Sequence, residues 1–325
     1  MSSQEIPLDF AAIISTVLEG VLYGISLVMF GGTLWALGYG RLKSEINRSM
    51  ALIAALLTIL STIHLAIDIK RLQDGFITYR DTIPGGPEAF FADVKQETFV
   101  FKNAVYSIQT LLGDAVVIYR CYVVWQSRSI IILAVLLWFA VAATSVGFLY
   151  NIAHATVYAE IIFVLNTGTW ITSFYALTIA TNVLSSTLLA YRIWTVSRGI
   201  PTPVRVTQRR TKTRLILRVL VEAAILYTLT LFAVLMCFAY ENNGQFIVLD
   251  MITPIISITF YMVFIRIGIA KNSPASATPA ALSPLNFVDV QTMQSQQRLH
   301  PMQSAQSIQY LSMDGDGGGG GELVM

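Results

Sequence analysis

Residues 129–150 read SIIILAVLLWFAVAATSVGFLY and contain no charged side chain. A helix of about 20 apolar residues crosses the roughly 30 Å hydrocarbon core of a bilayer. Inside lipid every backbone polar group must be paired, and these runs lack the alternation of barrel strands, so we expect helices. The sequence predicts an all-α bundle of seven transmembrane spans, at residues 10–37, 50–69, 99–125, 129–150, 170–194, 215–240 and 246–267.

The composition agrees with a membrane protein. Hydrophobic residues make up 55% of the 325 residues and charged residues 12%, against about 25% charged in an average soluble domain. This excludes a single soluble core and makes the lipid bilayer the expected partner. The formal net charge of +2 does not favour a nucleic-acid partner.

Lysine and arginine are spread unequally over the loops, and cytoplasmic loops carry the excess of these residues. The N-terminal tail, the fourth loop and the sixth loop have none, whereas the second loop, counted from Lys70 and Arg71 onward, also carries many acids. This bias predicts an N-terminus outside and a cytoplasmic C-terminus; separately, we expect the chain in the plasma membrane. The sequon Asn47-Arg48-Ser49 then faces the cytoplasm, and a glycan on Asn47 would invert this orientation. The basic residues of the expected cytoplasmic side are Arg41, Lys43 and Arg48 in the first loop, Arg128 in the third, Arg198, Arg205, Arg209, Arg210, Lys212 and Arg214 in the fifth, and Arg266 and Lys271 after the last span.

The chain changes character after the seventh span. Residues 272–325 are rich in Ser, Pro, Gln and Gly and end in a glycine run at 317–321. Such a segment cannot bury enough apolar surface to offset the entropy lost on ordering. We therefore expect a transmembrane domain at residues 1–271 and a disordered cytoplasmic tail at 272–325.

Four ionisable residues lie near the outer ends of the expected spans. Glu19 is in the first span, His64 and Asp68 are in the second, and Asp250 is in the seventh. Ionisable groups in hydrocarbon usually face the bundle interior and mark functional sites. In a bundle that closes span seven against spans one and two, these four side chains would line an outward-facing ligand pocket. The alternative is that Asp68 and Asp250 are simply wetted residues at the interface.

A second polar group lies deeper, toward the cytoplasmic side. Arg120 in span three and Glu222 in span six have depths that agree within about one helical turn, which favours an interhelical ion pair. Such a pair is either a switch contact or a static bridge. Asp114 in span three and Asn182 in span five are near mid-membrane, where they bond to each other or to water.

The sequence does not favour an enzyme. The three histidines, His64, His154 and His300, fall in a span, an outer loop and the tail, so they do not readily form one zinc site. The last span has no lysine for a retinal Schiff base, and phosphate-binding loops and nucleophile motifs are absent. We expect no catalytic residue, no cofactor and no metal site.

Six stretches carry a resemblance: EGVLYG at 19–24, STIHLAIDIKRLQDGF at 61–76, QTLLGDAVVIYRCYVVW at 109–125, TNVLSSTLLAYRIW at 181–194, VEAAILYT at 221–228 and TPIISITFYMVFIRIG at 253–268. With them, residues 10–270 resemble a family of seven-span integral membrane proteins from mushroom-forming fungi. The resemblance implies the topology and a fungal source, and it implies no activity. The layout also looks like a G-protein-coupled receptor, with Tyr119-Arg120-Cys121-Tyr122 where the rhodopsin-like class has an acidic residue, Arg and Tyr. The acidic residue is missing here, so this is a likeness of architecture.

Two functions follow as hypotheses. The first is an orphan receptor that senses a small or lipid-like ligand at the outer polar group and meets a cytoplasmic partner, such as a G protein, through the basic fifth loop. That loop's simpler role is attraction to anionic lipid headgroups. The second is a proton- or cation-coupled transporter or channel that uses the intramembrane acids, which are Glu19, Asp68, Asp114, Glu222 and Asp250.

Overall fold

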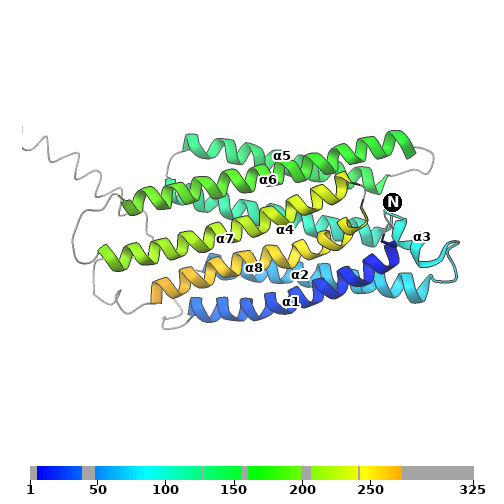
Figure 1. Cartoon of the computed structure of the whole chain (residues 1–325), viewed down its shortest axis with the longest axis horizontal. Helices are drawn as coiled ribbons and strands as arrows, with labels where there is room; N and C mark the ends of the chain where they lie inside the picture. Colours follow the sequence, from blue (N-terminus) through cyan, green and yellow to red (C-terminus); the bar gives the residue numbers. More distant parts are fainter. Residues whose placement is uncertain are drawn as a thin grey trace, which may run out of the picture. The chain divides into compact units, whose positions relative to one another are not determined.

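The computed structural model of the chain describes residues 6–38, 48–125, 128–154, 160–198, 206–240 and 242–272. This part contains eight α-helices and no strand, so the all-α prediction is confirmed (Figure 1). The expected tail at 272–325 lies almost wholly outside the described residues, as does Asn47. The elements are α1 (Leu8–Gly38), α2 (Arg48–Gln73), a π-helical turn η2 (Asp74–Thr78), α3 (Gly86–Ala92), α4 (Glu97–Trp125), α5 (Arg128–Ala153), α6 (Glu160–Arg198), α7 (Val206–Ala239) and α8 (Gly244–Asn272).

The long helices lie side by side and run in alternating directions, while α3 is a single short helix near the N-terminal end of the bundle (Figure 1). Helix α8 packs against α1 and α7, and α4 packs against α2, α5 and α6. The start of α1 and the end of α8 lie at opposite ends of this bundle (Figure 1).

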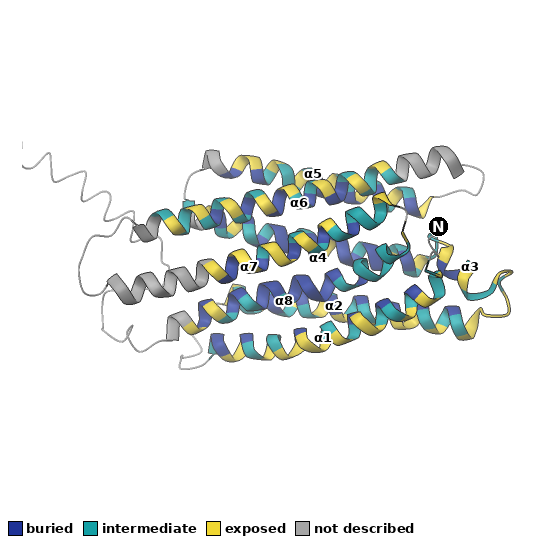
Figure 2. Cartoon of the chain, viewed as in Figure 1, coloured by how far each residue is buried: buried dark blue, intermediate teal, exposed yellow. Residues whose placement is uncertain are grey.

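Six of the described helices are long and apolar enough to cross a membrane: α1, α2 with η2, α5, α6, α7 and α8. Large apolar side chains such as Val28 and Leu136 are exposed on the outer faces, whereas α8 is largely buried (Figure 2). An apolar exterior is unfavourable in water and suits lipid. The chain is therefore a multi-pass membrane protein.

Helix α4 is not among these six helices, and it carries polar side chains that are buried in the bundle. Lys102, Asn103, Gln109 and Asp114 are all buried. Gln109 donates hydrogen bonds from Nε2 to the backbone oxygen of Thr253 at 2.7 Å and to two serine hydroxyls of α2 and α8. Polar groups on α4 thus stabilise contacts between helices, and their presence lowers the mean hydropathy of this helix.

One glycine sets how closely α1 and α8 approach. A Cβ atom built on Gly268 of α8 would lie 2.8 Å from the backbone oxygen of Ala36 in α1 and 2.9 Å from its Cβ. The absence of a side chain therefore lets the two backbones touch. By contrast, a Cβ atom on Gly24 or Gly31 of α1 would meet nothing within 4 Å.

Several helix boundaries differ from the sequence-based expectation. Helix α2 continues through Lys70 and Arg71, which we had assigned to the second loop. Helix α6 begins at Glu160, whereas we expect the fifth span to begin at residue 170. The backbone of α7 begins at Val206, so the positions of Arg209, Arg210, Lys212 and Arg214, expected in the fifth loop, are helical.

Candidate functional site

The four residues expected near the outer end of the spans come together with a lysine in the bundle interior. Glu19 lies on α1, His64 and Asp68 on α2, Lys102 on α4 and Asp250 on α8. Each of the five residues is between 1% and 5% exposed. His64 and Asp68 are four residues apart and thus share one face of α2. We call these five residues the charged network.

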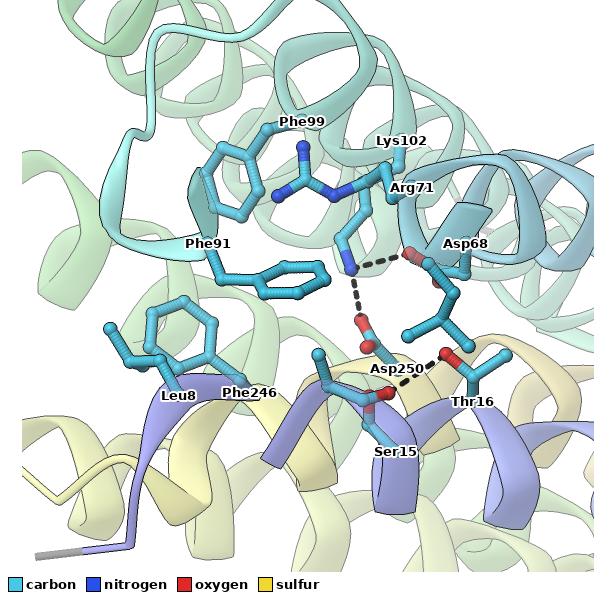
Figure 3. Close-up of a pocket in the computed structure, with 12 residues that line it drawn as sticks. Leu8, Ser15, Thr16, Asp68, Arg71, Phe91, Phe99, Lys102, Phe246 and Asp250 are labelled. Carbon is cyan, nitrogen blue, oxygen red and sulfur yellow. Dashed lines mark hydrogen bonds and ion pairs between the residues drawn. The ribbon is translucent and has the colours of Figure 1, made fainter. Parts of the chain in front are cut away.

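Short contacts link the charged network across four helices. His64 Nδ1 lies 2.7 Å from Glu19 Oε1 and 3.4 Å from Asp68 Oδ2. The Lys102 ammonium donates to Asp68 Oδ1 at 2.8 Å and to Asp250 Oδ1 at 2.6 Å (Figure 3). The network therefore runs from α1 through α2 and α4 to α8 without a break.

Two carboxylate oxygens of the charged network remain without a hydrogen-bond partner. Glu19 Oε2 and Asp68 Oδ2 are both buried and accept no hydrogen bond from the described residues. A buried polar atom in this state costs free energy unless a proton, a water molecule or an ion fills the gap. The network thus has unused acceptor capacity at Glu19 and at Asp68.

The charges of these residues also indicate that the network can accept a further cation. The carboxylates of Asp68 and Asp250 contact the ammonium of Lys102, and the carboxylate of Glu19 contacts His64; Arg71 lies nearby but donates its hydrogen bonds to neutral groups. Within the five residues of the charged network, two negative charges are left over with a neutral His64, and an imidazolium balances one of them. Because an unbalanced buried charge is costly, the network favours the uptake of one more positive charge.

A small hollow borders the charged network (Figure 3). The space open to the centre of a water molecule is about 30 Å³, which is room for one or two waters and too little for a drug-sized molecule. Ammonium, carboxylate and phenyl groups thus meet around a water-sized space. The residues that line it are Leu8, Ala12, Ser15, Thr16, Asp68, Arg71, Leu72, Phe91, Phe99, Lys102, Phe246 and Asp250.

Arg71 fastens the loop after α3 to the end of α2. Its Nη1 donates to Gln96 Oε1 and Thr98 Oγ1, each at 3.1 Å, and its guanidinium lies 5.1 Å from the centre of the Phe99 ring. Gln96 in turn donates to the backbone oxygen of Phe90 at 2.8 Å. Arg71 therefore holds the segment between α3 and α4 next to the hollow, by hydrogen bonds to neutral groups and by a cation–π contact.

The sequence analysis missed both cations of this site. Arg71 was assigned to a loop, whereas it lies in the last turn of α2 and is buried. Lys102 lies inside the expected third span at 99–125. An intramembrane lysine is itself a signal of a buried partner, so the rule that identified Glu19 and Asp250 could also have found Lys102.

The inner polar group does not come together as expected. Glu222 accepts a hydrogen bond at 2.7 Å from Arg218 on its own helix, and its side chain is 52% exposed. The guanidinium of Arg120 lies over the ring of Phe264 at 4.7 Å, and its Nη2 has no hydrogen-bond partner among the described residues. The predicted Arg120–Glu222 pair is therefore wrong, because Glu222 points away from the interior.

Asn182 and Asp114 also do not bond to each other. Asn182 Nδ2 donates to Thr228 Oγ1 at 2.7 Å and to the backbone oxygen of Ala224 at 3.3 Å, and thereby joins α6 to α7. Asp114 is buried, and its Oδ2 has no hydrogen-bond partner in the described part of the chain. These residues thus belong to separate contacts.

Comparison with known proteins gives no further guide to the role of these sites. No family model matches the chain, and no curated protein is significantly similar to it. The geometry of the charged network is therefore the main guide to function.

Proposed function

We propose that this multi-pass membrane protein is a seven-span receptor with an extracellular N-terminus, and that the charged network is its site for a small polar ligand. One observation carries the proposal: Lys102 links carboxylates of α2 and α8 beside a hollow at one end of the bundle. The small volume of the hollow favours a small polar ligand over a lipid-like one.

The seven-span topology is supported by the place of α4. This helix has 29 residues, which is enough to cross a bilayer, and it packs among α2, α5, α6 and α8. With α4 as a span, the chain crosses seven times. The opposite positions of the start of α1 and the end of α8 (Figure 1) and the basic loops then favour a cytoplasmic C-terminus in a fungal plasma membrane.

The ligand acts, in this proposal, by competing for the contacts of Lys102. A polar group that binds Asp250 or Lys102 weakens the link between α4 and α8. Because α8 packs along α1 and α7, a shift of α8 reaches the cytoplasmic end of α7, next to the basic positions expected to meet a G protein or anionic lipid. A shift of this kind between packed helices is an established switching mechanism.

The test is a G-protein activation assay in cells that express the full chain. We expect Lys102→Met to raise basal activation, because the variant removes the link that holds α8. Lys70→Met is the matched control, since the side chain of Lys70 is 63% exposed and pairs with Asp74, four residues along the chain. Equal surface expression of both variants is required. Failure of the wild type and of Lys102→Met to activate any Gα subunit would refute the receptor proposal.

A second function, proton- or cation-coupled transport, is favoured by a different observation. The unpartnered oxygens Glu19 Oε2 and Asp68 Oδ2 offer a place for a proton or cation. Deeper polar groups such as Gln109, Ser61 and Ser257 continue inward from them. In proteoliposomes, cation or proton uptake that is lost in Asp68→Asn or Asp114→Asn would support transport and count against a pure receptor.

A further inference from the structure

We propose that Glu19, His64 and Asp68 bind a divalent transition-metal ion of the zinc class. The site would be held between α1 and α2, in the interior of the bundle. The inference goes beyond the receptor proposal and does not depend on it, because a bound metal is compatible with either a signalling or a transport protein.

The atoms that would bind the metal already lie close to one another. One nitrogen or oxygen from each of the three side chains lies within 4.8 Å of the others. In a tetrahedral zinc site with bonds of about 2.0–2.1 Å, neighbouring donor atoms are separated by roughly 3.3 Å. The distance from His64 Nδ1 to Asp68 Oδ2, 3.4 Å, agrees with this value. The 2.7 Å distance from His64 Nδ1 to Glu19 Oε1 needs to open by roughly half an ångström.

Unpartnered atoms point to a missing occupant. Glu19 Oε2 and Asp68 Oδ2 are buried and lack hydrogen-bond partners among the described residues. Both residues belong to the same three-residue group. Buried oxygens of this kind normally have a partner. A cation beside His64 would satisfy Asp68 Oδ2, and it would satisfy Glu19 Oε2 as well when the Glu19 carboxylate binds through both oxygens.

The contacts of Asp68 allow a metal and Lys102 to be held together. Lys102 binds Oδ1 of Asp68, whereas Oδ2 is the oxygen that faces His64. The metal and the ammonium therefore use different oxygens of one carboxylate. Lys102 also orients this carboxylate, as the surrounding hydrogen bonds of a metal ligand commonly do.

The donor set favours a transition metal over calcium or magnesium. Imidazole nitrogen suits zinc, copper, iron and nickel, and carboxylate oxygens also bind zinc at about 2.0–2.2 Å. Calcium takes six to eight oxygen ligands and magnesium demands octahedral oxygen coordination. Three monodentate donors and the one or two waters that the hollow can hold give at most five ligands, fewer than either ion takes. The hollow, which Asp68 also lines and which has room for one or two waters, can supply a water as fourth ligand.

The charges agree with this assignment. The divalent ion replaces the proton on His64, since a metal-bound imidazole is neutral. Its two positive charges match the carboxylates of Glu19 and Asp68, while Lys102 and Asp250 form their own pair. The bound ion thus supplies the positive charge that the charged network lacks.

The test uses the purified full chain in lipid nanodiscs, stripped with a chelator and titrated with Co²⁺ and then with Zn²⁺. We expect equimolar binding, the visible absorption bands of four-coordinate cobalt, their loss on adding zinc, and a raised melting temperature. Glu19→Gln and His64→Ala should each weaken binding by at least about tenfold. His154→Ala is the control, because His154 is exposed at the end of α5 and should bind metal as the wild type does.

Two results would overturn the proposal. One is the absence of saturable cobalt absorption in the wild type. The other is metal binding that persists in Glu19→Gln but falls in His154→Ala, which means an adventitious surface site. If His64→Ala does not fold, cobalt binding by the nearly isosteric variant Glu19→Gln decides whether the proposed site is correct. The readout involves no signalling, so its failure leaves the receptor proposal to be judged separately by the activation assay.

Discussion

The ammonium nitrogen of Lys102 on α4 lies 2.6 Å from Oδ1 of Asp250 on α8, inside the bundle. The same nitrogen lies 2.8 Å from Asp68 Oδ1 on α2. One cation thus holds two carboxylates from two other helices. Removing one partner of a buried ion pair leaves an uncompensated charge, which costs more than the pair itself contributes. The stability of this end of the bundle therefore depends on Lys102.

Lys102→Met should destabilise the folded protein by about 3–5 kcal/mol, because Asp68 and Asp250 would then repel each other in the interior. The measurement is the midpoint of thermal unfolding in nanodiscs. The control Lys70→Met removes an exposed pair with Asp74 and should cost less than about 1 kcal/mol. An unchanged midpoint in Lys102→Met would show that the buried bridge is not formed.

The double variant Lys102→Met/Asp250→Asn should be less destabilised than the sum of its two single variants. Each single change leaves a charge unpaired, whereas the double change removes both charges of the 2.6 Å contact. We expect a coupling energy of about 1–3 kcal/mol in the double-mutant cycle. Purely additive effects would contradict a direct contact between the two residues.

Gly268→Ala should destabilise the packing of α1 against α8 by about 1–3 kcal/mol. The new methyl group would clash with backbone and Cβ atoms of Ala36, at 2.8 and 2.9 Å, and backbone atoms cannot move aside easily. Gly24→Ala in α1 is the matched control, because its methyl group meets nothing within 4 Å. We expect Gly24→Ala to be neutral or stabilising, since alanine favours helix over glycine.

The sequence predicted that four ionisable residues of the first, second and seventh expected spans gather, but it predicted the Arg120–Glu222 pair incorrectly. Glu19, His64, Asp68 and Asp250 meet because charged groups within apolar spans turn away from lipid. The depth of a residue follows from its position along a span at 1.5 Å per residue. The direction in which its side chain points around the helix axis matters only relative to the neighbouring helices, and the sequence does not specify where those helices lie. Arg120 and Glu222 have matching depths but different directions.

Glu222→Gln should therefore have a small effect. Glu222 is half exposed and bonds to Arg218 one turn earlier, and such a pair contributes about 0.3–0.5 kcal/mol. A cycle that combines Glu222→Gln with Arg120→Ala should give no coupling energy in thermal unfolding. A coupling above about 1 kcal/mol would instead restore the interhelical pair expected from the sequence.

The proposed orientation can be tested by glycosylation in eukaryotic cells. Asn47 lies in an acceptor sequence on the first loop, which we expect in the cytoplasm, so the wild type should carry no glycan at this position. Arg80→Asn creates the acceptor Asn-Asp-Thr at residues 80–82, in an exposed turn of the second loop that we expect outside. This variant should gain a glycan that a glycosidase removes, seen as a shift in gel mobility. Glycosylation of Asn47 together with an unmodified Arg80→Asn variant would reverse the proposed orientation, and the hollow beside Lys102 would then open to the cytoplasm.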